Sequence, residues 1–74
     1  LEADGTRRSD KAIKNWNDIE AHLILKYRNA LMEIGCGPGE FLLEARNRGW
    51  KYVLGNELEP TSAELATSKG LDIY

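Results

Sequence analysis

Residues 31–43 read LMEIGCGPGEFLL, and three structural elements follow one another there without a gap. An almost continuous apolar run over residues 31–34 passes into a glycine-rich turn, and a further apolar segment begins directly after Glu40. This order is typical of a buried parallel strand that ends in a tight turn and opens into a helix. Such a turn brings bare backbone and a helix N-terminus against a nucleoside-type cofactor. The stretch therefore predicts a class of cofactor and leaves the substrate open.

The spacing of the glycines discriminates between cofactor classes. A dinucleotide site requires G-x-G-x-x-G, in which the third glycine lets a pyrophosphate lie on the helix N-terminus. Here Gly35, Gly37 and Gly39 recur at every second residue, and Glu40 stands where that third glycine would fall. The Glu40 carboxylate would repel a pyrophosphate, and the Gly-Lys-Ser/Thr ending of a phosphate-binding P-loop is missing. The loop therefore fits a cofactor that carries an adenosine but no phosphates.

The stretch 31–39 resembles the E/D-x-G-x-G-x-G signature of class I S-adenosylmethionine-dependent methyltransferases. Residues 49–58, which read GWKYVLGNEL, are similar to that family's second strand and its terminal acidic residue, and a third strand would begin at residues 71–74. The resemblance implies a Rossmann-like α/β fold with a parallel sheet and flanking helices. It also implies S-adenosylmethionine as the cofactor and methyl transfer as the reaction.

The resemblance implies binding residues, with no catalytic residue and no metal ligand among them. Glu57 follows Gly39 by 18 residues, close to the ~20-residue spacing of the analogous dinucleotide site, and would accept hydrogen bonds from the ribose hydroxyls. Leu58 would form an apolar wall for the adenine, and Glu33 would lie near the methionine ammonium. The predicted cofactor-binding residues are Glu33, Gly35, Cys36, Gly37, Pro38, Gly39, Glu57 and Leu58.

Each of these residues also has a purely structural interpretation. The glycines could serve close packing at a strand-to-helix connection, and Glu57 could be a solvated carboxylate at a strand end. Glu33 could cap a helix N-terminus, and Cys36 could simply be a small residue in a crowded turn. His22, the only histidine, has nothing nearby in sequence that would orient it as a base, so we expect an ordinary surface residue.

Composition restricts the remaining function classes. The chain has 74 residues, a net charge of −2 and one cysteine, so no intramolecular disulfide can form and a reduced, cytoplasmic setting is favoured. No basic stripe could follow a nucleic-acid backbone, and we expect Arg7 and Arg8 to lie in a solvated tail. No apolar run approaches the ~20 residues that span a bilayer. A small-molecule cofactor is therefore the partner that the sequence supports.

The pattern along the chain predicts a loose segment followed by one α/β unit. Before the first strand, the spacing of the apolar residues predicts one helix or two short ones broken near Asn17. Asn17 and Glu20 resemble a capping box there. Another capping box, Thr61 to Glu64, predicts the start of the last helix. The predicted segments are a loose stretch at 1–9, helix at 10–28, strand at 30–34, helix at 40–48 ending at Gly49, strand at 51–57, helix at 61–69 and strand from 71.

Residues 10–74 thus resemble the N-terminal third to half of a methyltransferase domain, with the remainder of that domain missing. We expect a piece of this kind to be inactive alone. Two other functions stay open: a non-catalytic cofactor-binding or scaffolding module, and a fragment of a nicotinamide-dependent oxidoreductase, which shares the sheet topology. The glycine spacing disfavours the oxidoreductase.

Overall fold

Strands and helices alternate along the chain as the sequence predicts. The computed structural model describes residues 7–24 and 26–74. Its elements are α1 (Asp10–His22), β1 (Ala30–Ile34), α2 (Glu40–Asn47), β2 (Tyr52–Asn56), α3 (Pro60–Ser68) and β3 (Asp72–Ile73). Within these residues the strands form one open parallel sheet in the order β1-β2-β3. The expected α/β class with a parallel sheet is confirmed.

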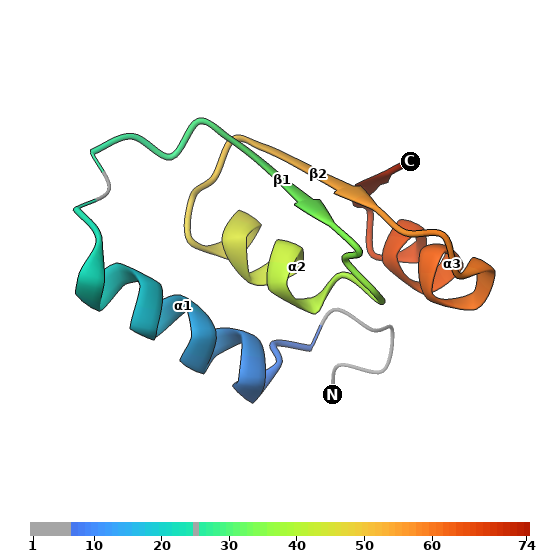
Figure 1. Ribbon diagram of the computed structural model, residues 1–74, viewed down its shortest axis with the longest axis horizontal. Helices are drawn as coiled ribbons and strands as arrows, with labels where there is room; N and C mark the ends of the chain where they lie inside the picture. Colours follow the sequence, from blue (N-terminus) through green and yellow to red (C-terminus); the bar gives the residue numbers. More distant parts are fainter. Residues whose placement is uncertain (1–6, 25) are drawn as a thin grey trace.

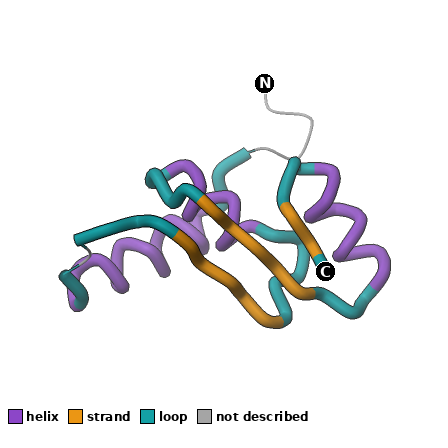
Figure 2. The backbone as a smooth tube through the Cα atoms, turned by 90° about the horizontal axis from the view of Figure 1, so that it is seen from above, coloured by secondary structure: helices purple, strands orange, loops and turns teal. Residues whose placement is uncertain are grey.

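The helices cover only one face of the sheet. α2 lies between the strands and α1 (Figure 1), and in Figure 2 the strands form a layer with α1 and α2 behind it and α3 beside β3. Along β2, Val53 and Gly55 point toward the helices and are buried, whereas Tyr52 is 54% exposed. The core residues are Trp16, Cys36, Leu42, Ala45, Val53, Ala66 and Leu71.

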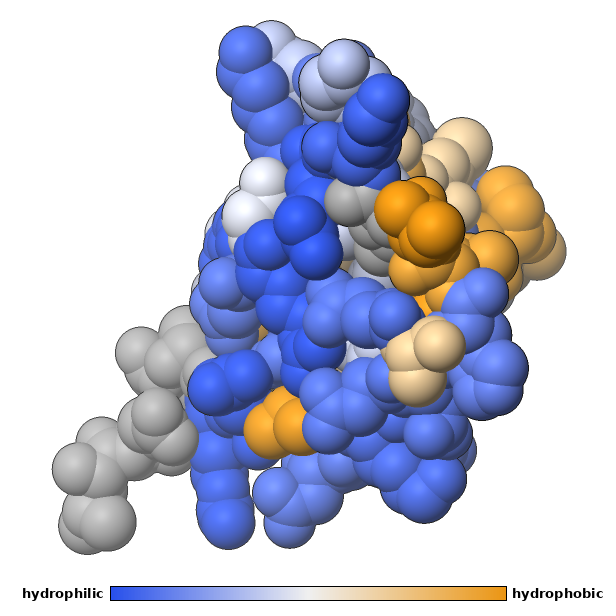
Figure 3. Space-filling model, turned by 90° about the vertical axis from the view of Figure 1, so that its left-hand side faces the viewer, coloured by the Kyte–Doolittle hydropathy of each residue, from blue (hydrophilic) through white to orange (hydrophobic). Residues whose placement is uncertain are grey.

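The opposite face of the sheet is open. Met32 and Ile34 on β1 are 55% and 73% exposed, and Tyr74 after β3 is 71% exposed. Figure 3 shows strongly apolar residues gathered along one side of the molecular surface. An apolar run such as that of β1 is typical of a strand covered on both faces, but the described helices supply only one layer.

α1 is shorter than the predicted helix. It is a single helix that begins after Ser9, whose side chain accepts a hydrogen bond from the Ala12 N–H, and it ends at His22. The predicted extension to residue 28 is wrong: Leu23 has extended backbone. Ile24 and Tyr27 are 98% and 80% exposed, so these two side chains supply no buried apolar contact that would stabilise further helical turns. Of the two predicted alternatives, one helix or two short ones broken near Asn17, the single helix is the one present. Asn17 lies inside it, and its side-chain oxygen accepts a hydrogen bond from Arg48.

The ends of α2 and α3 show one confirmed cap and one wrong one. Gly49, with φ of 97°, follows α2, and the Trp50 N–H donates to the Ala45 carbonyl at 3.1 Å, as predicted for a left-handed cap. At α3 the predicted Thr61 capping box does not form, because Pro60 is already the first helical residue. Glu59 caps the helix instead, accepting from the N–H groups of the next two non-proline residues.

Candidate functional site

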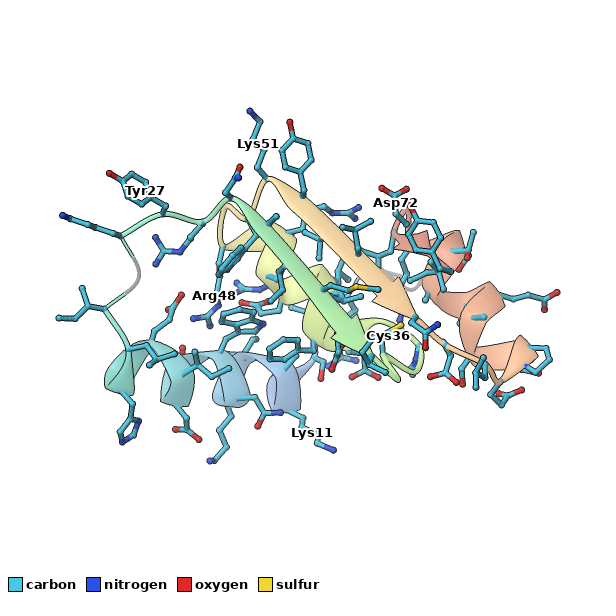
Figure 4. All side chains as sticks on the ribbon, turned by 45° about the horizontal axis from the view of Figure 1, so that its top comes forward. Lys11, Tyr27, Cys36, Arg48, Lys51 and Asp72 are labelled. Atoms are coloured by element: carbon cyan, nitrogen blue, oxygen red, sulfur yellow. The ribbon has the colours of Figure 1, made fainter. Side chains whose placement is uncertain are left out.

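The predicted site residues meet at the carboxyl ends of β1 and β2. The Cys36 N–H donates to the Asn56 carbonyl at 2.9 Å, which holds the glycine-rich loop against the end of β2. Figure 4 shows Cys36 in this loop, just beyond the end of β1. Ligands of open parallel sheets bind outside the carboxyl ends of the strands, so the loop lies where such a ligand would be held.

Glu57 is fixed beside the loop by two backbone hydrogen bonds. Its Oε1 accepts from the Gly37 N–H at 2.7 Å, and its Oε2 accepts from the Glu59 N–H at 2.8 Å. These bonds, that from Glu59 first, lower the pKa of Glu57, so the side chain is an anion at neutral pH. Each carboxylate oxygen has a further lone pair, and Glu57 can therefore accept hydroxyl donors from a ligand lying on the loop.

The three loop glycines do not serve the same purpose. A Cβ placed on Gly35 or Gly37 would meet no atom within 4 Å, so these two residues border open space. A Cβ on Gly39 would lie 2.5 Å from Leu71 Cδ1 and 3.2 Å from Ala66 Cβ. Gly39 therefore packs against Ala66 on α3 and against Leu71, which follows that helix, while Gly35 and Gly37 leave the loop backbone open to a ligand.

This difference predicts unequal costs for two alanine variants. Both Gly37 (φ 58°) and Gly39 (φ 86°) have left-handed backbone, so either alanine carries conformational strain. Gly39→Ala must additionally displace Leu71 or Ala66, and we expect it to lower the free energy of unfolding by about 1–3 kcal/mol more than Gly37→Ala does. Urea denaturation followed by circular dichroism measures both. Equal losses would contradict the packing role of Gly39.

A cavity of about 240 Å³ lies next to the loop. The end of β1 contributes Glu33, the loop contributes Cys36 and Pro38, and the start of α2 contributes Phe41. α2 also contributes Glu40, and the remaining wall comes from Ser9 and the first half of α1, which was predicted only as a packing element. No local signal could have revealed this wall, because α1 precedes the loop by many residues and reaches it only through its packing on α2.

Glu33 brings an incompletely satisfied carboxyl group to this cavity. Its Oε1 is buried and has no hydrogen-bond partner among the described residues. Burial raises the pKa of Glu33, because desolvation penalises the charged form. The alternative that Glu33 caps a helix is wrong for α2, whose N-cap residue is Gly39 and which has no side-chain cap. A buried carboxyl oxygen without a partner favours a ligand that brings a hydrogen-bond donor.

Three other predicted residues have distinct surroundings. Cys36 is 7% exposed, and burial together with the Glu33 and Glu57 carboxylates raises the pKa of its thiol. The Pro38 carbonyl accepts a hydrogen bond from Lys69 Nζ at 2.6 Å, which ties the loop to the end of α3. Leu58 is 89% exposed and directly follows Glu57. An apolar side chain is thus presented to solvent at the edge of the site.

Two residues outside the predicted site are also placed by the structure. Arg8 was expected in a solvated tail, but its Nη2 lies 2.6 Å from Oε2 of the buried Glu44. His22 lies on the last turn of α1, with Nδ1 2.7 Å from the Asp18 carbonyl. The expectation for Arg8 is therefore wrong: this arginine belongs to the contact between the N-terminal segment and α2.

Comparison with known proteins adds no family assignment: neither a scan against protein-family models nor a search of curated proteins found a match. In the part of the chain that the structure describes, no three His, Cys, Asp or Glu side chains are grouped so that they could hold a metal ion. None of the described helices is both long and apolar enough to cross a membrane. Inference about function therefore depends on the geometry of the loop, Glu57 and the cavity.

Proposed function

We propose that this chain binds S-adenosylmethionine and supplies the cofactor half-site of a methyltransferase. The observation that carries the proposal is the hydrogen bond from the Gly37 N–H to Glu57, which places an ionised carboxylate beside a loop whose backbone is open at Gly35 and Gly37. Vicinal ribose hydroxyls are suitable donors to such a carboxylate. A loop without side chains leaves room for the nucleoside beside it.

The other predicted residues fit the two ends of this cofactor. Leu58, exposed beside Glu57, offers an apolar surface for the adenine. Glu33 lines the neighbouring cavity with an unpartnered oxygen, which supports binding of the methionine ammonium at that end. Glu40 at the start of α2 disfavours a dinucleotide, because its carboxylate would face the pyrophosphate.

When bound, S-adenosylmethionine supplies an electrophilic methyl group on a sulfonium. The chain's own residues bind and orient it: the loop backbone, Glu57 and Glu33 restrict its position, which is the main contribution that proteins make to such transfers. The raised pKa of Cys36 keeps its thiol protonated, so this buried side chain is a poor competing methyl acceptor.

Glu57→Ala tests the proposal directly. We expect S-adenosylmethionine to bind the variant at least about tenfold more weakly, because the ribose hydroxyls lose a charged acceptor. Isothermal titration of the cofactor into the chain measures this, with Glu64→Ala, which removes an exposed carboxylate on α3, as the matched control. Unchanged affinity in Glu57→Ala would remove Glu57 from the site.

Competition separates the proposal from its alternatives. S-adenosylhomocysteine should displace S-adenosylmethionine, and NAD should not; displacement by NAD alone would favour an oxidoreductase. Transfer of a labelled methyl group from the bound cofactor to an added acceptor would identify an enzyme. Cofactor binding without transfer to any acceptor would favour a non-catalytic binding module.

A further inference from the structure

We infer that Lys11, on the first turn of α1, recognises the carboxylate of an α-amino acid group held in the cavity beside the glycine-rich loop. This inference rests on the proposed function and extends it to a residue outside the predicted site. It assigns α1 a part in ligand recognition in addition to its packing on α2.

The cavity has opposite charges on walls that come from different parts of the chain. Among the described residues that line the cavity, Lys11 from α1 is the only cationic one, and Glu33 at the end of β1 has a carboxyl oxygen without a hydrogen-bond partner. Asn15 lies four residues after Lys11, on the same face of the helix, and also lines the cavity. An α-amino acid group carries one ammonium and one carboxylate, so it can pair with Glu33 and Lys11 at once.

Lys11 is available for this contact. No hydrogen bond or ion pair joins its ammonium to another residue of the described segments, whereas Lys14, one turn further along, is 3.1 Å from Asp18. Figure 4 shows the Lys11 side chain extending outward from the start of α1, the end of that helix nearer to Cys36. Lys11 is exposed and lines the cavity, so its ammonium is accessible to a ligand carboxylate held there.

A second carboxylate on the cavity wall decides which way round the amino acid group of the ligand lies. Glu40, an exposed residue at the start of α2, also lines the cavity. With Glu33 and Glu40 on the side of the sheet and α2, the ammonium is attracted there and the carboxylate is repelled. The carboxylate therefore faces α1, where Lys11 and the Asn15 amide are the hydrogen-bond donors.

The test compares S-adenosylmethionine with its decarboxylated analogue, which keeps the adenosine, sulfonium and ammonium but has no carboxylate. Both are titrated into the 74-residue chain and into Lys11→Gln. We expect Lys11→Gln to lower the affinity for S-adenosylmethionine by about five- to tenfold. The affinity for the analogue should stay within about twofold of the wild-type value. Lys14→Gln, on the same helix, should change neither affinity. Glu33→Gln should lower the affinity for both ligands, because both carry the ammonium group.

The outcomes distinguish this inference from the proposed function. Suppose that the wild-type chain binds both ligands and that Lys11→Gln lowers neither affinity, or lowers both equally. The role of Lys11 is then overturned, and the cofactor site stands. If the wild-type chain binds neither ligand, the proposed function fails and the inference fails with it. Circular dichroism of Lys11→Gln checks that α1 remains folded.

Discussion

Trp16→Ala is expected to lower the free energy of unfolding by about 3–5 kcal/mol. Trp16 is 2% exposed, its ring stacks on Phe41 at a centroid distance of 4.6 Å, and its Nε1–H donates to the Phe41 carbonyl at 3.0 Å. It also lies 5.9 Å from Trp50. A chain of this size has a total stability of only about 4–11 kcal/mol, so the substitution removes a large share of it.

Thermal unfolding followed by circular dichroism measures this loss, which we expect to lower the melting temperature by at least about 12 °C. Tyr27→Ala is the matched control, because Tyr27 is 80% exposed and its removal should change stability by less than about 0.5 kcal/mol. Trp16→Phe retains the stacking and should be intermediate. A Trp16→Ala protein as stable as the Tyr27→Ala control would show that α1 does not depend on this contact.

Glu44→Gln is expected to destabilise the chain by about 3 kcal/mol, at the lower end of the range for breaking a buried ion pair. The Glu44 side chain is 1% exposed and accepts from Arg8 Nε at 2.9 Å and from Arg48 Nε at 2.8 Å. After the substitution Arg48 keeps the Glu20 carboxylate at 2.7 Å and the Asn17 side-chain oxygen at 2.9 Å. This remaining pairing is why the lower end of the range applies.

Glu44 also makes the free energy of unfolding depend on pH. Hydrogen bonds from Arg8, followed by those from Arg48, lower the pKa of Glu44 from 4.5 to about 2. Because the folded-state pKa is the lower one, the contribution of Glu44 is complete above about pH 4.5 and is lost as the pH falls toward 2. Urea denaturation at several pH values measures the free energy of unfolding. Its fall between pH 4.5 and 2 should be smaller in Glu44→Gln than in the wild-type chain by up to roughly 3 kcal/mol. Parallel pH profiles for the two proteins would contradict this role.

Much of the candidate site was predictable because its determinants are close together in sequence. The apolar run before Gly35 and the alternating glycines predicted strand, turn and helix, and all three are present. The spacing to Glu57 predicted a carboxylate near the loop, and the structure places it 2.7 Å from the Gly37 N–H. What these residues bind stays a prediction that the titrations above test.

Three residues have roles that depend on partners distant in sequence, so their surroundings in the sequence could not reveal them. Nothing near Arg8 in sequence indicates that it pairs with Glu44, 36 residues away. Gly39 looks like its two neighbouring glycines, and only the position of Leu71 against it reveals a packing role. Lys11 resembles any exposed helical lysine until α1 is placed beside the loop.

The amino-acid sequence alone determined the order of strands and helices and the turns at which glycines adopt left-handed backbone. Each of these follows from backbone sterics and hydrophobic periodicity over a few residues. Tertiary structure alone decided where α1 lies, which glycines are packed and which are open, and which charges line the cavity. Those features arise from contacts between segments far apart along the chain, whose free energy exists only once the core around Trp16 and Leu42 has formed.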